Sequence, residues 1–130
     1  MIVDASALLA IVLHEDDGPL FEEVLAAEKD ELTMSPVNYV EAYVRASKPG
    51  PRDYVSVLDE LIQTADIRLA PITVDQAHLA RQAYETYGKG RHPAGLNLGD
   101  CFAYALAKAR RKPLLYKGND FSQTDIEAAL

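Results

Sequence analysis

Short apolar runs alternate with longer segments of helical spacing along the whole chain. The run at residues 1–3 is typical of a strand that is buried on both faces, and three further short segments are predicted to be strands: residues 31–34, 67–72 and 113–116. The longer segments place apolar residues three and four positions apart, and they are residues 5–14, 20–28, 36–47, 52–66, 74–87 and 99–111. Strands that alternate with helices predict an α/β sandwich with a mostly parallel sheet.

Boundary signals support these segments. Ser35 followed by Pro36 is a typical helix start. Residues 16–19 form a turn sequence, and residues 88–98 hold three of the seven glycines, so an irregular loop is expected there. With no repeat, low-complexity stretch or linker, the chain is expected to be one domain, residues 1–130.

Composition limits where the protein is expected to work. No apolar run approaches the roughly 18 residues that span a bilayer, so no membrane association is expected. Cys101 is the only cysteine, which excludes an intrachain disulfide and a zinc site of cysteines. A cytoplasmic location is therefore expected.

Charge is unevenly distributed along the chain. The net charge is −7, and residues 1–75 carry five Lys/Arg against fifteen Asp/Glu, whereas residues 76–130 carry eight against five. So acidic a protein is a poor non-specific binder of nucleic acid, because contacts to phosphate supply most of that affinity. Two basic clusters remain, each either a solvated face or a local contact: Lys89, Arg91 and His92, and then Lys108, Arg110, Arg111 and Lys112 with Lys117.

Four carboxylates stand where predicted strands end or helices are packed. Asp4 directly follows the first strand and Asp120 comes just past the fourth. Ligands of such folds sit at the carboxyl ends of the strands. Glu41 lies on or beside the apolar stripe of the helix 36–47, and Asp100 is in the first turn of an almost wholly apolar helix.

Each acid also has a purely structural interpretation. Asp4 could only cap its helix, and Asp120 could only form a turn. Glu41 could pair with Arg45 or extend to solvent from the edge of the apolar stripe. Asp100 could form a capping box with Asn97 or interact with the helix dipole. None of these roles excludes metal binding.

The four acids make most sense together. If the first and fourth strands are neighbours, all four side chains meet at the switch point of the sheet. Crowded carboxylates repel one another unless a hard cation lies between them, and oxygen-only ligands suit Mg²⁺ or Mn²⁺. Such a cation can activate a water and neutralise charge on a phosphate. The three histidines have no metal-ligand spacing, and neither a Gly-rich phosphate loop nor a nucleophile elbow is present.

In their order and spacing these motifs resemble the PIN-domain ribonucleases, in particular the VapC-type toxins of bacterial and archaeal toxin–antitoxin pairs. The resemblance covers essentially the whole length of the chain. It rests on residues 2–6 (IVDAS), Glu41, residues 87–93 (YGKGRHP), residues 97–105 (NLGDCFAYA) and residues 114–121 (LLYKGNDF).

The resemblance implies a three-layer PIN-like sandwich with a sheet of four to five strands. It assigns metal binding and catalysis to Asp4, Glu41, Asp100 and Asp120, and supporting roles to Ser6 and Asn119. Ser6 would orient Asp100 or a phosphate, and Asn119 stands where relatives can carry a second Asp.

The resemblance also implies partners. Proteins of this family usually cleave RNA as homodimers, and a small VapB-like antitoxin inhibits them by laying its tail over the active-site groove. Mg²⁺-dependent hydrolysis of RNA is therefore the expected activity, with Mn²⁺ as an alternative cation. Lys89, Arg91 and His92 are the candidate RNA contacts.

Two other functions fit parts of the pattern. A haloacid-dehalogenase-like phosphatase also places a catalytic Asp after its first strand, but that family has a second acid two positions on, where this chain has Ser6. A PIN-like module that only binds a partner would need no metal, and the full set of four acids argues against it.

Overall fold

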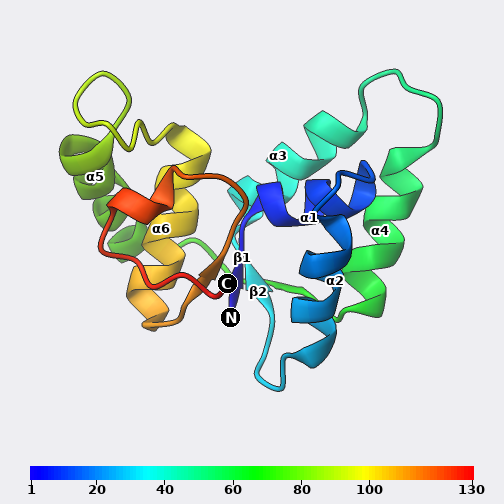
Figure 1. The fold of residues 1–130 in the computed structure, drawn as a ribbon. Coiled ribbons are helices and arrows are strands. Elements are labelled where there is room, and N and C mark those ends of the chain that lie inside the picture. Colours follow the sequence, from blue (N-terminus) through cyan, green and yellow to red (C-terminus); the bar gives the residue numbers. More distant parts are fainter.

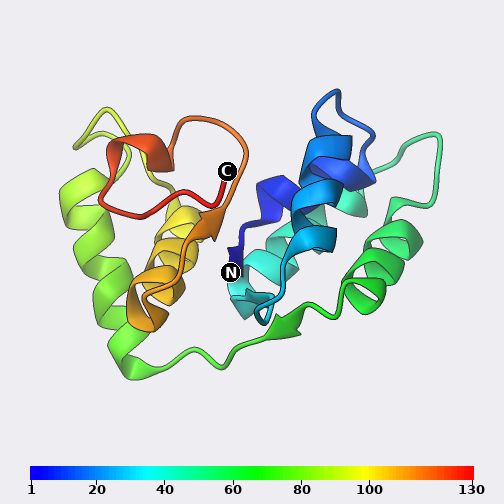
Figure 2. The same ribbon diagram turned by 60° about the horizontal axis from the view of Figure 1, so that its bottom comes forward.

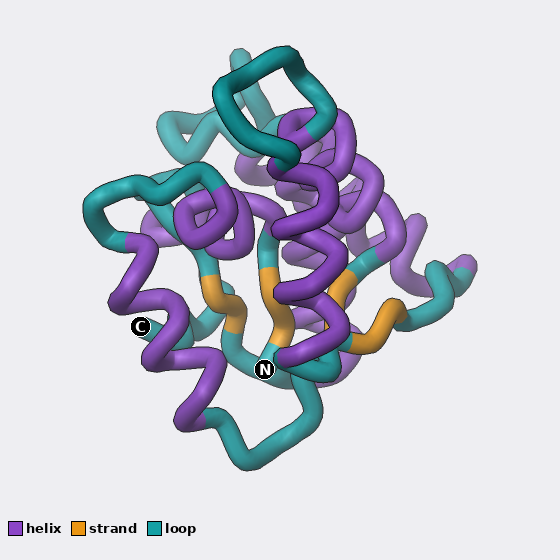
Figure 3. Tube along the Cα trace, turned by 90° about the vertical axis from the view of Figure 1, so that its right-hand side faces the viewer, coloured by secondary structure: helices purple, strands orange, loops and turns teal.

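The computed structural model describes residues 1–130 and arranges them in three layers, with a parallel sheet between two groups of helices (Figures 1 and 2). The strands, visible side by side in Figure 3, are β1 (Ile2–Val3), β2 (Thr33–Met34), β3 (Arg68–Leu69) and β4 (Leu114–Leu115). Their order is β3-β2-β1-β4, and every neighbouring pair is parallel. The first and fourth strands are therefore neighbours, as the site hypothesis requires.

Helices cover both faces of the sheet (Figure 1). One face is covered by α1 (Ala5–Val12), α2 (Gly18–Ala27), α3 (Pro36–Ala46) and α4 (Tyr54–Thr64), and the other by α5 (Val74–Tyr87) and α6 (Leu98–Arg110). A short 3₁₀ helix, η1 (Phe121–Gln123), lies in the C-terminal segment. None of the helices has the length and the apolar character that crossing a membrane would take.

The apolar residues of the strands alternate between two cores. Val3 and Leu115 belong to a core of 17 buried residues on the α1–α4 side, whereas Ile2 and Leu114 belong to a core of 14 buried residues on the α5–α6 side. Successive strand residues point to opposite faces, so a sheet that is covered on both faces needs apolar residues at every position. This explains why both residues of β1 and both residues of β4 are apolar.

The predicted elements are confirmed, but their boundaries differ. The helix 74–87 has the predicted bounds, whereas every strand is shorter than its apolar run. The difference is largest for the run 67–72, of which only Arg68–Leu69 forms β3; both residues are exposed, because β3 lies at the edge of the sheet and pairs only with β2. Leu114 also makes an isolated parallel bridge to Ala128. The sheet therefore has four strands, and a single bridge stands where a fifth strand was the alternative expectation.

The turn predicted at residues 16–19 is partly wrong. Gly18 and Pro19 open α2 instead of preceding it, because the fixed φ of proline suits the first turn of a helix. Gly18 also lets α2 approach α1 closely, since a Cβ there would lie 2.7 Å from the carbonyl oxygen of Ala10.

Candidate active site

The pairing of β1 with β4 brings the four predicted acids to one end of the sheet. Asp4 follows β1 and Asp120 lies in the segment that follows β4. α3 carries Glu41 and packs against α6, whose first turn holds Asp100. Burial raises the pKa of Asp100, and the charges of the other three acids raise it further. We call these four residues the acid cluster.

Asp4 is buried, and its two carboxylate oxygens have different partners. Oδ2 accepts hydrogen bonds from the backbone N–H of Ser6 at 3.1 Å and from Ser6 Oγ at 2.6 Å, so Asp4 does cap α1. Oδ1 accepts only a long bond of 3.5 Å from Nδ2 of Asn38. Burial raises the pKa of Asp4, the bonds from Ser6 lower it, and the charge of Asp120 raises it. The cap thus uses one oxygen and leaves the other available.

Ser6 joins the segments that follow β1 and β4. Its Oγ donates to Asp4 and accepts a hydrogen bond of 2.9 Å from the backbone N–H of Lys117. The structure shows no hydrogen bond from Ser6 to Asp100, because the hydroxyl group is already engaged two residues back along its own helix. The side chain of Lys117 pairs with Glu15 and Asp17 from the α1–α2 loop, which holds the segment after β4 in place.

Asp100 forms the capping box that its structural interpretation predicted. Its backbone N–H donates to Asn97 Oδ1 at 2.9 Å, and its Oδ2 accepts from the backbone N–H of Asn97 at 3.1 Å. The residue is nevertheless 7% exposed and makes no ion pair. Burial, and then the charges of Asp4, Asp120 and Glu41, raise its pKa to about 7 against the lowering effect of the Asn97 bond. The carboxyl group of Asp100 therefore caps α6, and its negative charge is poorly stabilised at the same time.

Glu41 is half-buried on α3 and lies against the first turn of α6. No ion pair joins it to Arg45, so that structural alternative is not realised. Burial raises the pKa of Glu41, the charge of Asp4 adds to the rise, and the amide of Asn38 lowers it. Its carboxylate occupies the space in front of Gly99, where a Cβ would lie 2.3 Å from Glu41 Oε2. Glycine at position 99 therefore lets this carboxylate lie against the first turn of α6, which carries Asp100.

Asn38 is a site residue that the sequence reasoning missed. It is fully buried, at 0% exposed, and its Nδ2 donates to the carbonyl of Gly99 at 3.0 Å and to Asp4 Oδ1 at 3.5 Å. Its own Oδ1 is buried without a hydrogen-bond partner. The signal was an amide three residues before Glu41, on the same face of a predicted helix. Asn38 ties β1, α3 and α6 together directly behind the acid cluster.

Asp120 is the exposed member of the acid cluster, and its neighbour Asn119 is exposed as well. Asp120 precedes η1 and makes no side-chain capping bond, so its carboxylate is not consumed by turn formation. Asn119 contributes its backbone carbonyl, which accepts from the Oγ of Ser122 at 2.7 Å. Asp120 joins the cluster through its charge, which acts on both Asp4 and Asp100.

The two basic clusters lie at different ends of the α5–α6 pair. Lys89, Arg91 and His92 are in the loop between α5 and α6, and this loop leads into the first turn of α6, which contains Asp100. Lys108 and its basic neighbours are at the far end of the same helix, about 15 Å along its axis at a rise of about 1.5 Å per residue. Lys117 of the second cluster does lie beside Ser6, but its side chain is paired with Glu15 and Asp17. We therefore consider the first cluster as the one that could help the acid cluster to hold a ligand.

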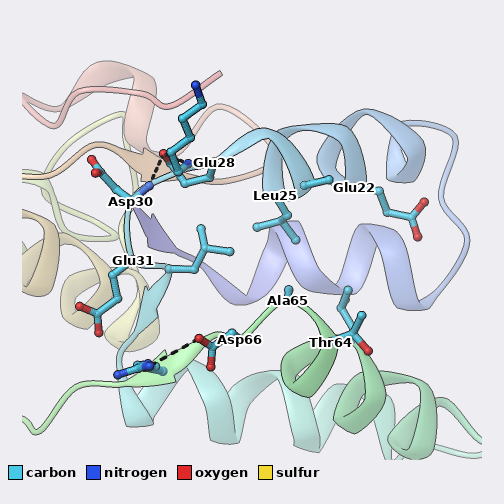
Figure 4. Close-up of a pocket in the computed structure, with 13 residues that line it drawn as sticks. Glu22, Leu25, Glu28, Asp30, Glu31, Thr64, Ala65 and Asp66 are labelled. Carbon is cyan, nitrogen blue, oxygen red and sulfur yellow. Dashed lines mark hydrogen bonds and ion pairs between the residues drawn. The ribbon is translucent and has the colours of Figure 1, made fainter.

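The largest cavity of the molecule is not at the acid cluster. It has a volume of about 650 Å³ and lies between the end of α2, the end of α4 and β3, and Figure 4 shows Glu22, Glu28, Glu31 and Asp66 among its lining residues. A smaller cavity of about 380 Å³ does border the cluster, with Ser6 and Glu41 in its wall. We therefore place the candidate site by its chemistry and not by cavity size.

The residues of the acid cluster fit a hard divalent cation in their donor type. All are carboxylates, the pKa values of Asp4, Glu41 and Asp100 are raised, and a missing side chain at Gly99 gives one of them room. No three His, Cys, Asp or Glu side chains are close enough to form a ready-made set of ligands. The four acids are thus linked by the effect of their charges on one another's pKa values and not by direct contact. Water would have to complete the coordination shell of any bound cation.

Comparisons with known proteins agree with this arrangement. A family model described as PIN domain matches residues 1–127. Ribonuclease VapC28 of Mycobacterium tuberculosis is 46% identical over 131 residues, covering 100% of this chain and 98% of the relative. Ribonuclease VapC of Mycolicibacterium smegmatis is 46% identical over 132 residues, covering 98% of each. The crystal structure of Mycobacterium tuberculosis VapC20, a sarcin–ricin loop cleaving toxin, matches with a TM-score of 0.78 at 12% identity, covering 96% of this chain and 95% of that one.

The four-stranded parallel sheet between two helical layers is therefore a PIN fold. The chain belongs to the PIN-domain family and, within it, to the VapC ribonucleases. This confirms the resemblance on which the expected activity rested, and it leaves the haloacid-dehalogenase-like alternative without support. The likeness to VapC20, at 12% identity, supports the fold alone.

Proposed function

We propose that this protein, acting as one domain over residues 1–130, is an Mg²⁺-dependent endoribonuclease and the toxin of a VapBC-type pair, with Mn²⁺ as an alternative cation. Membership of the VapC ribonucleases supports the activity. The observation that supports its location is the acid cluster, in which buried carboxylates from β1 and α6 repel one another at the carboxyl end of the sheet.

In this proposal Asp4 and Asp100 hold the cation, and Glu41 and Asp120 assist directly or through water. When bound, the cation would supply an activated water and neutralise the charge that grows on the scissile phosphate. Both principal ligands are held by hydrogen bonds that orient them, from Ser6 in one case and within the capping box in the other. Oriented ligands need less rearrangement when a cation binds.

The proton on Asp100 is part of the proposal. Burial and the neighbouring acids raise the pKa of Asp100 to about 7, so its carboxyl group in the metal-free protein gives up its proton only around neutral pH. Ligation requires the carboxylate form, so binding of the cation must release this proton. Affinity for the cation should therefore rise as the pH increases through neutrality.

RNA would approach from the side of the loop between α5 and α6. Lys89, Arg91 and His92 lie in this loop and remain our candidate contacts to the RNA backbone. The cluster around Lys108 lies at the opposite end of α6 and two of its members are paired with acids, Lys108 with Asp125 and Lys112 with Asp30. We therefore do not assign RNA binding to it.

We also propose that the protein works as a homodimer in the cytoplasm and is inhibited by a VapB-like antitoxin. Val40, Tyr43 and Val44 form an exposed apolar row on α3, at 54%, 48% and 51% exposed, which supports burial against another chain. The excess of acids in residues 1–75 suits a basic inhibitor tail. Light scattering of the purified protein, alone and with the candidate antitoxin, tests both assemblies.

The central experiment incubates the purified protein, free of any partner, with cellular RNA in the presence of Mg²⁺ or of EDTA. Cleavage that requires Mg²⁺ and falls by about a hundred-fold or more in Asp4→Asn supports the proposal. The substitution keeps the shape of the side chain and its acceptor for Ser6, so folding should be retained.

A matched control keeps the result interpretable. Asp59→Asn makes the same chemical change on the exposed face of α4 and should cleave like the wild type. Cleavage that persists in Asp4→Asn would point to contamination or to a different site. Absence of cleavage in the wild type, together with no Mg²⁺ binding by titration calorimetry, would favour a module that only binds a partner.

A further inference from the structure

A second cavity of about 580 Å³ opens between α5 and α6, within the range of roughly 300–1,000 Å³ that small-ligand pockets occupy. Its walls include Ala80, Arg81, Tyr84, Lys89, Leu98 and Phe102. We call it the α5–α6 cavity.

This cavity differs in charge from the rest of the molecular surface. Its lining contains two cationic side chains and no carboxylate. Arg81 is paired with Glu85 at 3.2 Å on the exposed face of α5, whereas Lys89 makes no ion pair. Each of the four other sizeable cavities is lined by at least two carboxylates. In a protein of net charge −7, the α5–α6 cavity is the one large hollow whose charge favours an anion.

Tyr84 is held in the wall of this cavity by the loop that follows α5. Its Oη donates to the carbonyl of Lys89 at 3.4 Å, and the guanidinium of Arg91 lies over its ring, 5.5 Å from the centroid. Gly88 makes room for the ring, because a Cβ there would lie 2.7 Å from Cδ2 of Tyr84. The aromatic side chain is therefore positioned before any ligand arrives.

The cavity is continuous with the acid cluster through one residue. Asn97 lines the cavity and also forms the capping box with Asp100, donating its backbone N–H to Asp100 Oδ2 at 3.1 Å. The next residue, Leu98, is 73% exposed at the mouth of the cavity. A ligand in the cavity would thus lie beside the site where we place the scissile phosphate.

We propose that the α5–α6 cavity receives one nucleobase of the RNA strand next to the scissile phosphate, and this proposal rests on the ribonuclease function proposed above. Aromatic and apolar walls suit the face of a base, and stacking on an aromatic side chain tolerates any base. Arg81 and Lys89 at the rim suit the phosphates on either side of it. The cavity would therefore hold the strand in position relative to the acid cluster.

The first test places a negative charge at the mouth of the cavity. Leu98→Glu should weaken binding of a short single-stranded RNA in EDTA by about ten-fold, measured by fluorescence anisotropy. Val74→Glu is the matched control, because Val74 is also 73% exposed and also begins a helix, but at the far end of the α5–α6 pair. Equal weakening by both substitutions would overturn the proposal.

The second test asks whether a base, and not only the backbone, is recognised. A set of RNAs, each lacking one base, should contain one position whose loss weakens binding by about ten-fold in the wild type and in Tyr84→Phe. The same base loss should have no effect in Tyr84→Ala, which removes the ring. A loss of affinity that is the same in all three proteins would overturn the proposal.

The remaining outcomes separate this proposal from others. A change of molar mass in Leu98→Glu, with unchanged RNA affinity, would make the cavity a contact between protein chains and overturn the proposal. Normal Mg²⁺-dependent cleavage by Leu98→Glu and Tyr84→Ala would overturn the base pocket and leave the proposed ribonuclease intact. Lack of cleavage by the wild type would instead remove the function on which the pocket depends.

Discussion

An aspartate lies near each end of helix α6, but only one of the two has a cationic partner within the chain. Near the last turn, Asp125 of the C-terminal segment accepts a hydrogen bond of 2.6 Å from Tyr104 and pairs with Lys108 at 2.5 Å. These contacts lower the pKa of Asp125. At the first turn, Asp100 meets three further acids and no cationic side chain, and its pKa is raised to about 7.

The two ends differ in what balances the charge. Asp125 is partly exposed and has a cationic partner within the chain, so its contacts serve to hold the C-terminal segment on α6. Asp100 is more deeply buried and lacks such a partner, although burial makes the need greater. A charge that a protein buries and leaves unbalanced is typical of a functional site, where a ligand supplies the missing charge.

The largest expected effect comes from removing one charge at each end. Asp100→Asn should reduce RNA cleavage by about a hundred-fold or more and make the metal-free protein more stable, because the unbalanced charge is gone. Asp125→Asn should leave cleavage within about two-fold and lower the free energy of unfolding by about 1 kcal/mol. RNA cleavage assays and urea unfolding in EDTA measure both. The comparison would fail if both substitutions raised the free energy of unfolding or if both lowered it.

Asn38→Ala should have the next largest effect. It removes the amide that bonds Asp4 and the carbonyl of Gly99, so we expect a loss of about 1–3 kcal/mol in the free energy of unfolding and about ten-fold in cleavage. Gln76→Ala is the control, since Gln76 is also a buried amide but lies on α5, away from the cluster. If both variants lose stability and neither loses activity, Asn38 has only a structural role.

Gly99→Ala should act on the cluster without weakening the fold. The new Cβ would displace the carboxylate of Glu41, and we expect Mg²⁺ affinity to fall by about ten-fold. Alanine is the better helix former by about 1 kcal/mol, so thermal stability should not fall. The double variant Gly99→Ala/Glu41→Asp shortens the displaced side chain and should regain part of the affinity in titration calorimetry.

The smallest expected effect is a difference between Asp100 and Asp125 in how their contributions to folding stability depend on pH. A raised pKa means that the folded protein keeps its proton longer than the unfolded chain, so the contribution of Asp100 to stability is lost as the pH rises from about 4 to about 7. The lowered pKa of Asp125 gives the opposite sign, with stability lost as the pH falls below about 4.

Thermal unfolding in EDTA between pH 3 and pH 8 measures both slopes, and each 1 kcal/mol corresponds to about 4 °C in this size range. Asp100→Asn should flatten the slope above pH 4 only in part, because the pKa values of Asp4 and Glu41 are also raised. A stability that rises between pH 5 and pH 7 would contradict the assignment of a raised pKa.

Much of the fold could be predicted from the sequence, because apolar periodicity follows directly from burial. The alternation of strands and helices and the position of Asp4 after β1 follow from that pattern alone. The strand lengths could not be predicted in this way, since only pairing decides where a ladder ends. The edge strand β3 illustrates the difference, with two paired residues in a six-residue apolar run.

The four acids of the candidate site could be proposed from the sequence, but the residues that hold them in place could not. Asn38 has no charge and lies inside an ordinary helix, so only the three-dimensional packing identifies it. Gly99 likewise reads as a weak helix former until Glu41 is placed against it. Lys108 is the reverse case, because the sequence made it a candidate contact and the structure argues against that role. It lies at the far end of α6 and is paired with Asp125.

The link between the segments after β1 and β4 also has a consequence during synthesis. Ser6 and Lys117 are 111 residues apart in the chain, yet one hydrogen bond joins them beside Asp4. Until β4 leaves the ribosome, β1 has a free edge and the segment that carries Asp120 does not yet exist. If Asp120 acts in the site as we propose, a chain that ends before β4 lacks part of that site, so the order of the strands delays completion of the proposed active site to the end of translation.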